Sequence, residues 1–218
     1  MAGKDRQHWD MIYHERAHQP YPPPDPLMLQ FTPPAPNPYA PSVSSKTVSR
    51  ALDLAGGLGQ NALWLAGQGY MVDLIDISRA ALTRAQEEAA RRARAPITDD
   101  EVGADTLPRA AQPDLVRGIN FIQADLDHAT LEREMYDVVC VFRFLDRALF
   151  PALRAAVRPG GRIVYETYNT RHTLTQPNFN PDYLLNVGEL AGVFADWRAL
   201  HGCEPPDDNT AQVVALKP

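Results

Sequence analysis

From residue 48 to the end of the chain, short apolar runs alternate with stretches whose apolar residues recur at helical spacing. This pattern predicts a series of strands, at 48–54, 70–77, 119–126, 136–142 and 162–168. Helices are predicted between them, at 60–68, at 78–94 and from Pro151 to a closing Arg158-Pro-Gly-Gly turn. A short helix at 188–194 and two final strands follow. The order indicates an α/β fold with a doubly wound, mostly parallel sheet and an antiparallel C-terminal strand pair.

The first 47 residues follow a different pattern. Residues 8–16 read as a short helix, and half of the 20 prolines then fall between Pro20 and Pro41. Proline lacks a backbone donor, so this stretch is predicted to be an extended strap on the domain, with a polyproline recognition peptide as the alternative. We therefore expect an N-terminal helix and strap, or lid, at 1–47 and a binding domain at 48–218. Within that domain, 95–117 has no apolar period and is predicted to be a mobile insertion.

The composition and net charge of the chain argue against several classes of function. The formal net charge of −6 argues against nucleic-acid binding through a broad basic face. Two cysteines cannot form a disulfide framework, which favours a reduced, cytoplasmic protein. The polar start and the lack of a long apolar segment predict neither a secretion signal nor a membrane span. The histidines lack the clustering that metal ligation needs, so no metal site is predicted.

Acidic residues close three successive predicted strands at the edge where ligands of such sheets bind. Asp53 precedes the turn Gly56-Gly57-Leu58-Gly59, Asp76 ends the second strand, and Asp125 ends the third. The turn also fits the dinucleotide pattern G-x-G-x-x-A, but Asp53 would repel a pyrophosphate there. An ammonium group at Asp53, a ribose diol at Asp76 and an adenine amine at Asp125 together describe S-adenosylmethionine. Each acid also has a structural reading, as an ion-paired or capping residue (Asp53), a helix cap (Asp76) or a turn residue (Asp125).

The chain resembles the class I S-adenosylmethionine-dependent methyltransferases over about residues 48–168. ALDLAGGLGQNA resembles the first motif of that family, with Ala55 where glycine is usual. LIDIS resembles the ribose-binding loop, QADL the adenine-binding loop, YDVVCVF the strand beside the transfer site, and VRPGGRIVYET the helix, turn and strand after it. Within the family, the chain is similar to tellurite-resistance-type and related small-molecule methyltransferases, including a W-D-x-x-Y start at Trp9. The resemblance implies a Rossmann-like fold and S-adenosylmethionine as cofactor.

The resemblance also assigns a set of cofactor-binding residues. They are Asp53, Ala55, Gly57, Gly59, Asp76, Ile77, Asp125, Leu126 and Phe142. If Asp76 holds the ribose, its replacement by alanine is expected to weaken cofactor binding and to leave folding nearly untouched. Trp9 and Tyr13 either close over the cofactor or pack on the domain.

Methyl transfer from a sulfonium demands alignment more than acid–base chemistry, and the sequence shows no catalytic constellation. The candidates beside the acceptor are Arg143, after the fourth strand, and Tyr168 and His172, in the loop after the fifth. Arg143 would bind an acidic or polar acceptor, or else pair with Asp146. Tyr168 and His172 would orient or deprotonate the acceptor, or else bond locally.

The sequence thus predicts a cytoplasmic methyltransferase that acts on a small molecule by in-line displacement. An RNA or protein methyltransferase is a second reading, supported by the Arg-rich end of the helix at 78–94 and by the strap. A non-catalytic partner subunit with the same fold is a third, and an NAD oxidoreductase is disfavoured by Asp53. The sequence does not identify the acceptor or the oligomeric state.

Overall fold

The computed structural model describes residues 2–36, 48–94, 118–128, 130–205 and 208–218. Its elements, in chain order, are α1 (Ala2–Glu15), α2 (Pro26–Phe31), β1 (Arg50–Leu54), α3 (Gln60–Gly67), β2 (Met71–Asp76), α4 (Arg79–Arg94), β3 (Ile119–Gln123), η3 (Leu126–His128), β4 (Tyr136–Phe142), η4 (Arg147–Leu149), α5 (Phe150–Ala156), β5 (Val157–Tyr168), η5 (Thr170–Leu174), η6 (Pro181–Tyr183), α6 (Glu189–Val193), β6 (Arg198–Cys203) and β7 (Thr210–Leu216). The predicted insertion at 95–117 lies outside the described residues.

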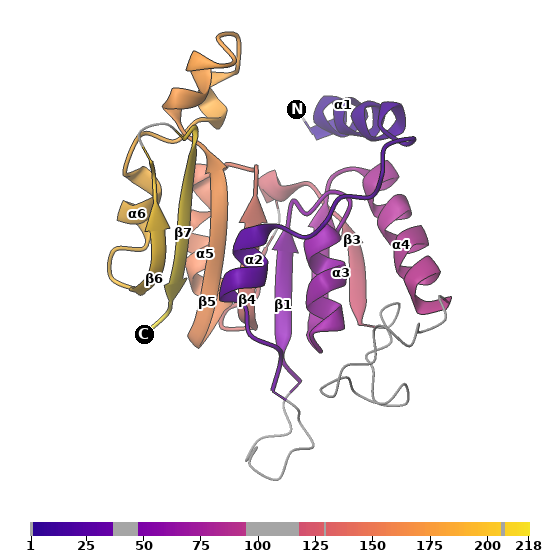
Figure 1. The fold of residues 1–218 in the computed structure, drawn as a ribbon, viewed down its shortest axis with the longest axis horizontal. Coiled ribbons are helices and arrows are strands. Elements are labelled where there is room, and N and C mark those ends of the chain that lie inside the picture. Colours follow the sequence, from indigo (N-terminus) through magenta and orange to yellow (C-terminus); the bar gives the residue numbers. More distant parts are fainter. Residues whose placement is uncertain (1, 37–47, 95–117, 129, 206–207) are drawn as a thin grey trace.

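The strands form one sheet in the order β3-β2-β1-β4-β5-β7-β6. The first five strands in that order are parallel, whereas β7 runs antiparallel to β5 and β6 antiparallel to β7. Helices α2, α3 and α4 cover one face, and α5 and α6 cover the other (Figure 1). The predicted doubly wound, mostly parallel α/β fold with an antiparallel end is confirmed.

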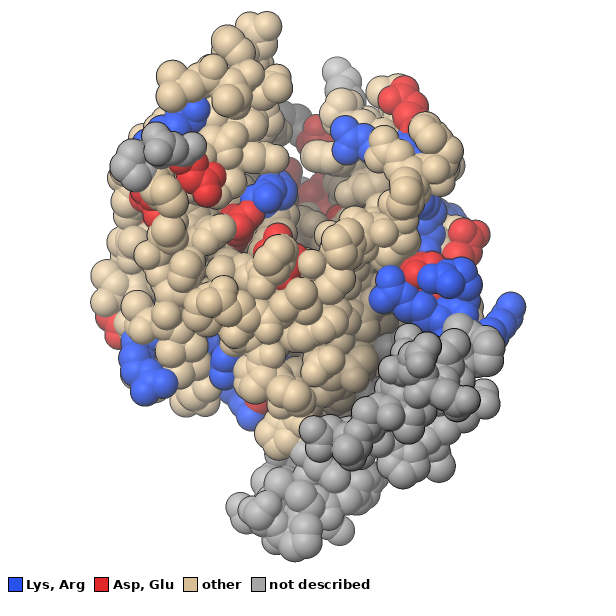
Figure 2. Space-filling model, viewed as in Figure 1, with Lys and Arg blue, Asp and Glu red and all other residues tan. Residues whose placement is uncertain are grey.

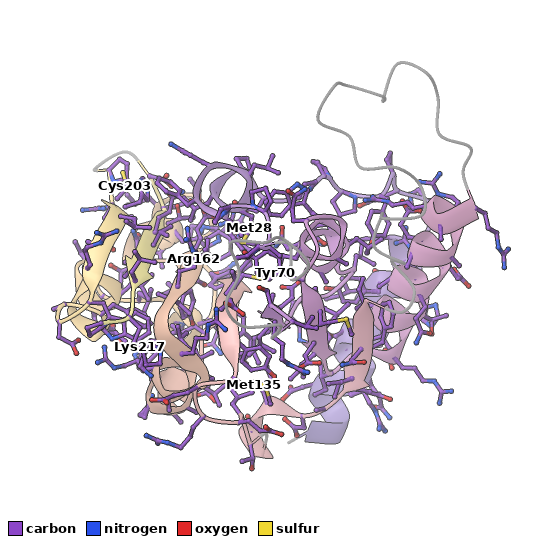
Figure 3. The ribbon with its side chains drawn as sticks, turned by 90° about the horizontal axis from the view of Figure 1, so that it is seen from below. Met28, Tyr70, Met135, Arg162, Cys203 and Lys217 are labelled. Carbon is purple, nitrogen blue, oxygen red and sulfur yellow. The ribbon has the colours of Figure 1, made fainter. Side chains whose placement is uncertain are left out.

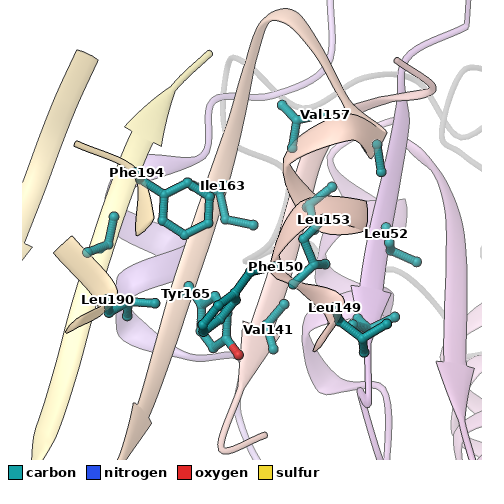
Figure 4. Packing of buried hydrophobic residues seen from close by; sticks show 14 of the residues in the cluster. Leu52, Val141, Leu149, Phe150, Leu153, Val157, Ile163, Tyr165, Leu190 and Phe194 are labelled. Atoms are coloured by element: carbon teal, nitrogen blue, oxygen red, sulfur yellow. The ribbon is translucent and has the colours of Figure 1, made fainter. Parts of the chain in front are cut away.

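Strand β4 shows why the apolar pattern was informative. Its run YDVVCVF is apolar on both sides of the chain, and Val138, Val139, Cys140 and Val141 are all buried. On the face of α5, Val141 packs with Phe150, Tyr165 and other residues of one continuous cluster (Figure 4). A strand buried on both faces reads as a continuous apolar run, and this one was predicted with the observed bounds.

Four predicted elements differ from the structure. The third strand, predicted at 119–126, ends at Gln123, so Asp125 follows the strand and does not lie within it. The strap is not extended throughout, because Pro26 opens the short helix α2 and Asp25 accepts the backbone N–H of Leu27 at its start. The turn Arg158-Pro-Gly-Gly, predicted to close a helix, belongs to β5, while α5 ends at Ala156. Helix α1 is longer than predicted, spanning Ala2–Glu15.

The strap is joined to the sheet by both apolar and polar contacts. Leu27 and Met28 of α2 are buried in the cluster that lines the α3 face of the sheet. The Tyr70 hydroxyl donates to the carbonyl of Pro33 at 2.9 Å, and the Arg162 guanidinium donates to the carbonyl of Phe31. Figure 3, seen from below, places Met28 beside Tyr70 and Arg162. This part of the strap is therefore an integral layer of the fold.

Candidate active site

A hollow opens at the edge of the sheet where the parallel strands end. Figure 2 shows it between α1 on one side and the segment after β5 on the other, with acidic side chains in its depth. The ends of β1, β2, β4 and β5 all reach this edge, since these strands are parallel. Parallel sheets of this kind bind ligands beyond the carboxyl ends of their strands.

The glycine turn after β1 has the backbone conformation that brings a main chain close to a ligand. Ala55, Gly57 and Gly59 have φ values of 53°, 56° and 72°, in the left-handed region. Glycine adopts that region freely, whereas a side chain there costs about 1–2 kcal/mol. Ala55, which stands where the resembling family has glycine, therefore carries local backbone strain. The turn leads directly into α3, whose N-terminus faces the same edge.

Gly57 combines a left-handed φ with a close approach of Tyr13 from α1. A Cβ there would lie 2.3 Å from the hydroxyl oxygen of Tyr13. We expect Gly57→Ala to lower the free energy of unfolding by about 1–2 kcal/mol, because left-handed strain is added and Tyr13 is displaced. Gly67→Ala is the matched control: at the end of α3 an added Cβ meets nothing within 4 Å, so a gain of up to about 1 kcal/mol is expected. Urea unfolding measures both, and equal midpoints would contradict the expectation.

Asp53 lies beneath the turn rather than in the open hollow. It is 1% exposed, and its Oδ2 accepts the backbone N–H of Ala62 in the first turn of α3 at 3.0 Å. The thiol of Cys140 donates to Oδ1 at 3.3 Å. Burial raises the pKa of Asp53 to about 7, against the lowering effect of the donors on Cys140 and Ala62. In this structure the Asp53 carboxylate accepts a backbone N–H in the first turn of α3.

Asp76 lies at the end of β2 and ties the glycine turn to α4. Its Oδ2 accepts the N–H of Gly57 at 2.8 Å, and its Oδ1 accepts the N–H of Ser78 at 2.8 Å. The Ser78 hydroxyl accepts the N–H of Ala81, which confirms the predicted cap of α4. Burial raises the pKa of Asp76, although backbone donors from Ser78, Gly57 and Ile77 act in the opposite direction.

Asp125 carries an unused acceptor. Its Oδ1 accepts the N–H of Asp127 at 3.1 Å, so the predicted turn role is present. Its Oδ2 is buried and has no partner among the described residues. A buried oxygen without a donor costs free energy, and a ligand amine would relieve that cost. Leu126 beside it is buried in the α5-face cluster, Ile77 follows Asp76, and Phe142 ends β4 at the same edge.

Helix α1 covers the edge of the glycine turn. The Asp10 carboxylate accepts from the Ser78 hydroxyl at 2.6 Å and from the N–H of Ala80 at 3.0 Å, which fixes α1 to the start of α4. Tyr13 on the same helix places its hydroxyl against Gly57. Burial, followed by the nearby charge of Asp76, raises the pKa of Tyr13. Trp9 stays 43% exposed on this helix.

Arg143 and Tyr168 meet on the opposite side of the hollow. Arg143 has a left-handed φ of 56°, and its guanidinium pairs with the buried carboxylate of Glu166. The pairing with Asp146 that the sequence suggested is wrong: Asp146 accepts the N–H of Ala148 and caps η4. The Arg143 guanidinium carbon lies 5.2 Å from the centre of the Tyr168 ring. The predicted acceptor-side residues are therefore neighbours.

His172 joins the same group of side chains. Its ring stacks on Tyr168 with centroids 4.0 Å apart, and its Nδ1 lies 2.9 Å from Nδ2 of Asn209. Sequence reasoning missed Asn209 and Glu166. Asn209 precedes β7 by one residue, and only the antiparallel pairing of β7 with β5 brings it to His172. Glu166 had a weak signal, as a carboxylate inside the apolar run RIVYETY.

The described residues fit an adenosyl amino-acid cofactor. The glycine turn, the carboxylate of Asp76 and the unpaired Oδ2 of Asp125 lie at or after the ends of the three adjacent parallel strands β1, β2 and β3. Fold and site together define an α/β methyltransferase. Residues 52–165, a little more than half of the chain, match the family described as "Methyltransferase domain", and the chain belongs to that family. Its cofactor is S-adenosylmethionine.

Solved structures agree with this fold. TehB from Haemophilus influenzae superposes with a TM-score of 0.56 at 17% identity, over 79% of this chain and 58% of that chain. A Mesorhizobium loti structure described as an S-adenosylmethionine dependent methyltransferase gives 0.53 at 17% identity, over 77% and 90% of the two chains. The structure published as "Conversion of a Disulfide Bond into a Thioacetal Group during Echinomycin Biosynthesis" gives 0.57 at 20% identity, over 97% and 92%.

A search of the curated proteins finds no match to this chain. In the described ranges, no helix combines the length and the apolarity needed to cross a membrane. The same ranges hold no group of three or more His, Cys, Asp and Glu side chains suited to a metal ion.

Proposed function

We propose that the protein transfers a methyl group from S-adenosylmethionine to a small molecule by direct in-line displacement. The observation that supports the proposal is the placement of two groups of residues along the order of the strands. Asp76, Asp125 and the glycine turn follow β2, β3 and β1, whereas Arg143, Tyr168 and His172 lie at or after the ends of the neighbouring strands β4 and β5. A donor and an acceptor held by these two groups would be positioned for displacement along one axis.

The cofactor, when bound, supplies a methyl group on a sulfonium, which is already an activated leaving group. The contribution of the protein is alignment. Asp76 would accept the ribose hydroxyls, and Asp125 Oδ2 would accept the adenine amine. Gly57 and Gly59, in left-handed conformations, let the methionine part approach the backbone, and Asp53 beneath them offers negative charge to its ammonium group. Ala55, Ile77, Leu126 and Phe142 would complete the cofactor site.

A small acceptor suits this hollow better than a macromolecule. The rim on one side is α1, and the opposite rim is the segment that carries η5 and η6 (Figure 1). The net charge of −6 disfavours a phosphate backbone as a ligand. The echinomycin-related structure and this chain align over almost their whole lengths, and its description concerns a biosynthetic small molecule. We also propose a cytoplasmic location, since Cys140 and Cys203 are free thiols.

We propose that the N-terminal segment predicted at 1–47 forms a lid on the binding domain at 48–218; residues 1 and 37–47 of that segment lie outside the described residues. Tyr13 against Gly57 and Asp10 at the start of α4 support this division. We expect amide exchange in residues 8–36 to slow when S-adenosylhomocysteine binds, because the cofactor adds contacts beneath α1. Asp10→Ala removes the hydrogen bonds to Ser78 and Ala80, so it should reduce this slowing while leaving exchange in β4 unchanged. Unchanged protection in the complex of the unsubstituted protein would count against the lid.

Isothermal titration with S-adenosylmethionine and S-adenosylhomocysteine tests the proposal first. Methyl transfer is then measured in a screen of thiol, amine, carboxylate, metalloid and RNA acceptors. Cofactor binding with methylation of a small molecule supports the proposed function. Methylation of RNA or protein alone, or binding without transfer to any acceptor, contradicts it.

A further inference from the structure

The acceptor side of the hollow contains a fixed group of rings. Tyr168 and His172 stack with their planes 23° apart, and Phe179 meets the His172 ring edge-on at 4.7 Å and the Tyr168 ring at 5.6 Å. His172 is only 8% exposed. A ring packed on its face and on its edge cannot turn over without disturbing both neighbours. The two nitrogens of His172 therefore have separate, fixed surroundings.

Asn209 decides which nitrogen of His172 carries the proton. Its amide nitrogen Nδ2 lies 2.9 Å from His172 Nδ1. With the Asn209 amide in this orientation its nitrogen donates, so Nδ1 is the accepting nitrogen and the neutral ring carries its proton on Nε2. The backbone around Asn209 is fixed, because its carbonyl accepts the N–H of Asn169, and Asn169 Nδ2 donates to the carbonyl of Thr210.

The second polar group on this side, Arg143, also presents donors. Its pairing with Glu166 uses one terminal nitrogen, and Glu166 Oε2 accepts from Gln212 Nε2 at 2.6 Å on its other side. Glu166 is 5% exposed, whereas the Arg143 side chain is 46% exposed. The guanidinium is therefore held by Glu166 over the face of Tyr168, and it has four N–H donors besides the one nearest Glu166.

We propose that Asn209 is a positioning residue that fixes His172 as a hydrogen-bond donor, and that Arg143, Tyr168 and His172 form a subsite for a planar oxyanion. This inference rests on the proposed function, because it names the class of acceptor that the same hollow takes. A flat anion at the edge of this group of side chains would accept from Arg143 and from Nε2–H of His172. On this proposal His172, with its Nδ1 occupied and its Nε2 protonated, orients the acceptor and is not the base that the sequence offered as an alternative.

Nitrogen NMR of the full-length protein tests the tautomer without any acceptor. Long-range ¹H–¹⁵N spectra of the neutral ring should show His172 protonated on Nε2. His201 is an internal reference: its Nε2 faces Gln212 Oε1 at 2.9 Å, and the Gln212 amide is oriented by its bond to Glu166. Asn209→Asp, which offers only acceptors, should move the His172 proton to Nδ1 and leave the His201 signals unchanged. A wild-type His172 protonated on Nδ1 overturns the proposal.

Benzoate and benzamide, two flat probes that differ in charge, test the anion preference. With the protein saturated by S-adenosylhomocysteine, benzoate should bind about tenfold more tightly than benzamide and shift the His172 Nε2 proton. Arg143→Gln should abolish the difference, whereas Arg154→Gln, which removes a surface pair with Asp196, should preserve it. Equal affinities, or a preference for benzamide, overturn the subsite. Absence of S-adenosylhomocysteine binding would instead contradict the proposed function and leave the NMR result standing on its own.

Discussion

Asp76→Ala is expected to weaken S-adenosylmethionine binding by roughly 30- to 1000-fold, or about 2–4 kcal/mol. The carboxylate would give two charge-assisted hydrogen bonds to the ribose, each worth roughly 1.5–3 kcal/mol, and water recovers part of that loss. The structure adds a cost that the sequence did not reveal. Asp76 already accepts the N–H groups of Gly57 and Ser78, so the substitution leaves two buried donors unpaired.

From the sequence alone, this substitution was expected to leave the stability of the fold nearly unchanged. The two backbone hydrogen bonds to Asp76 change that expectation. We expect the free energy of unfolding to fall by about 2–4 kcal/mol, because an unpaired buried donor costs about 1–3 kcal/mol. Asp76→Asn keeps one accepting oxygen and should fall between wild type and Asp76→Ala in both stability and affinity. Asp196→Ala is the control for loss of one acidic charge, since Asp196 forms only a surface pair with Arg154.

Calorimetric titration and thermal unfolding on the same samples separate the two effects. Fluorescence or circular dichroism must first show that each variant is folded at the titration temperature. A folded Asp76→Ala protein that binds S-adenosylmethionine with wild-type affinity would end the ribose assignment. A variant with wild-type stability would show that Gly57 and Ser78 find other partners for their N–H groups.

The sheet could be predicted because its signals are local. The continuous apolar run of β4, the glycines after β1 and the cap at Ser78 each depend on neighbours within a few residues. The strap was harder, because proline content suggested an extended chain, whereas Pro26 is well placed to start a helix. The number of prolines in a segment does not show where each proline lies, and the position decides whether a proline can start a helix.

The sequence could predict which side chains lie near the ends of the strands, but not the residues that they contact. Asp53, Asp76 and Asp125 were correctly placed at the edge of the sheet, yet the bond from Cys140 to Asp53 joins residues on different strands. The sequence suggested Asp146, three residues away, as one alternative partner of Arg143. In the structure Arg143 has a left-handed φ and pairs with Glu166 on β5. Asn209 had no signal at all. Partners that depend on strand order and register cannot be read from the spacing of residues along the chain.

Stability should fall as pH rises from about 5 to about 8, by about 2–3 kcal/mol, because Asp53 must lose its proton in a buried site. The folded pKa of Asp53 is raised to about 7 from the ordinary value of 3.8, so between these values the folded protein holds more protons than the unfolded chain. Glu88, whose pKa is lowered to about 2 by its bonds to Arg91, loses its stabilising effect only as pH falls below about 4.5. Asp53→Asn should reduce this slope and leave the part that comes from Asp76, whose pKa burial also raises. The asparagine keeps an oxygen for the N–H of Ala62.

The affinity for S-adenosylmethionine should increase as pH rises, whereas the stability should decrease. Only the ionised form of Asp53 attracts an ammonium group, so lowering the pH from about 8 to about 6 should weaken S-adenosylmethionine binding by about tenfold. Binding near pH 7 should release a proton, which titrations in buffers of different ionisation enthalpy detect. Asp53→Asn should bind weakly at every pH and release no proton. A steep pH dependence that survives in Asp53→Asn would assign the titration to another group. Wild-type affinity that is flat across this range would mean that the buried charge caps α3 and takes no part in holding the cofactor.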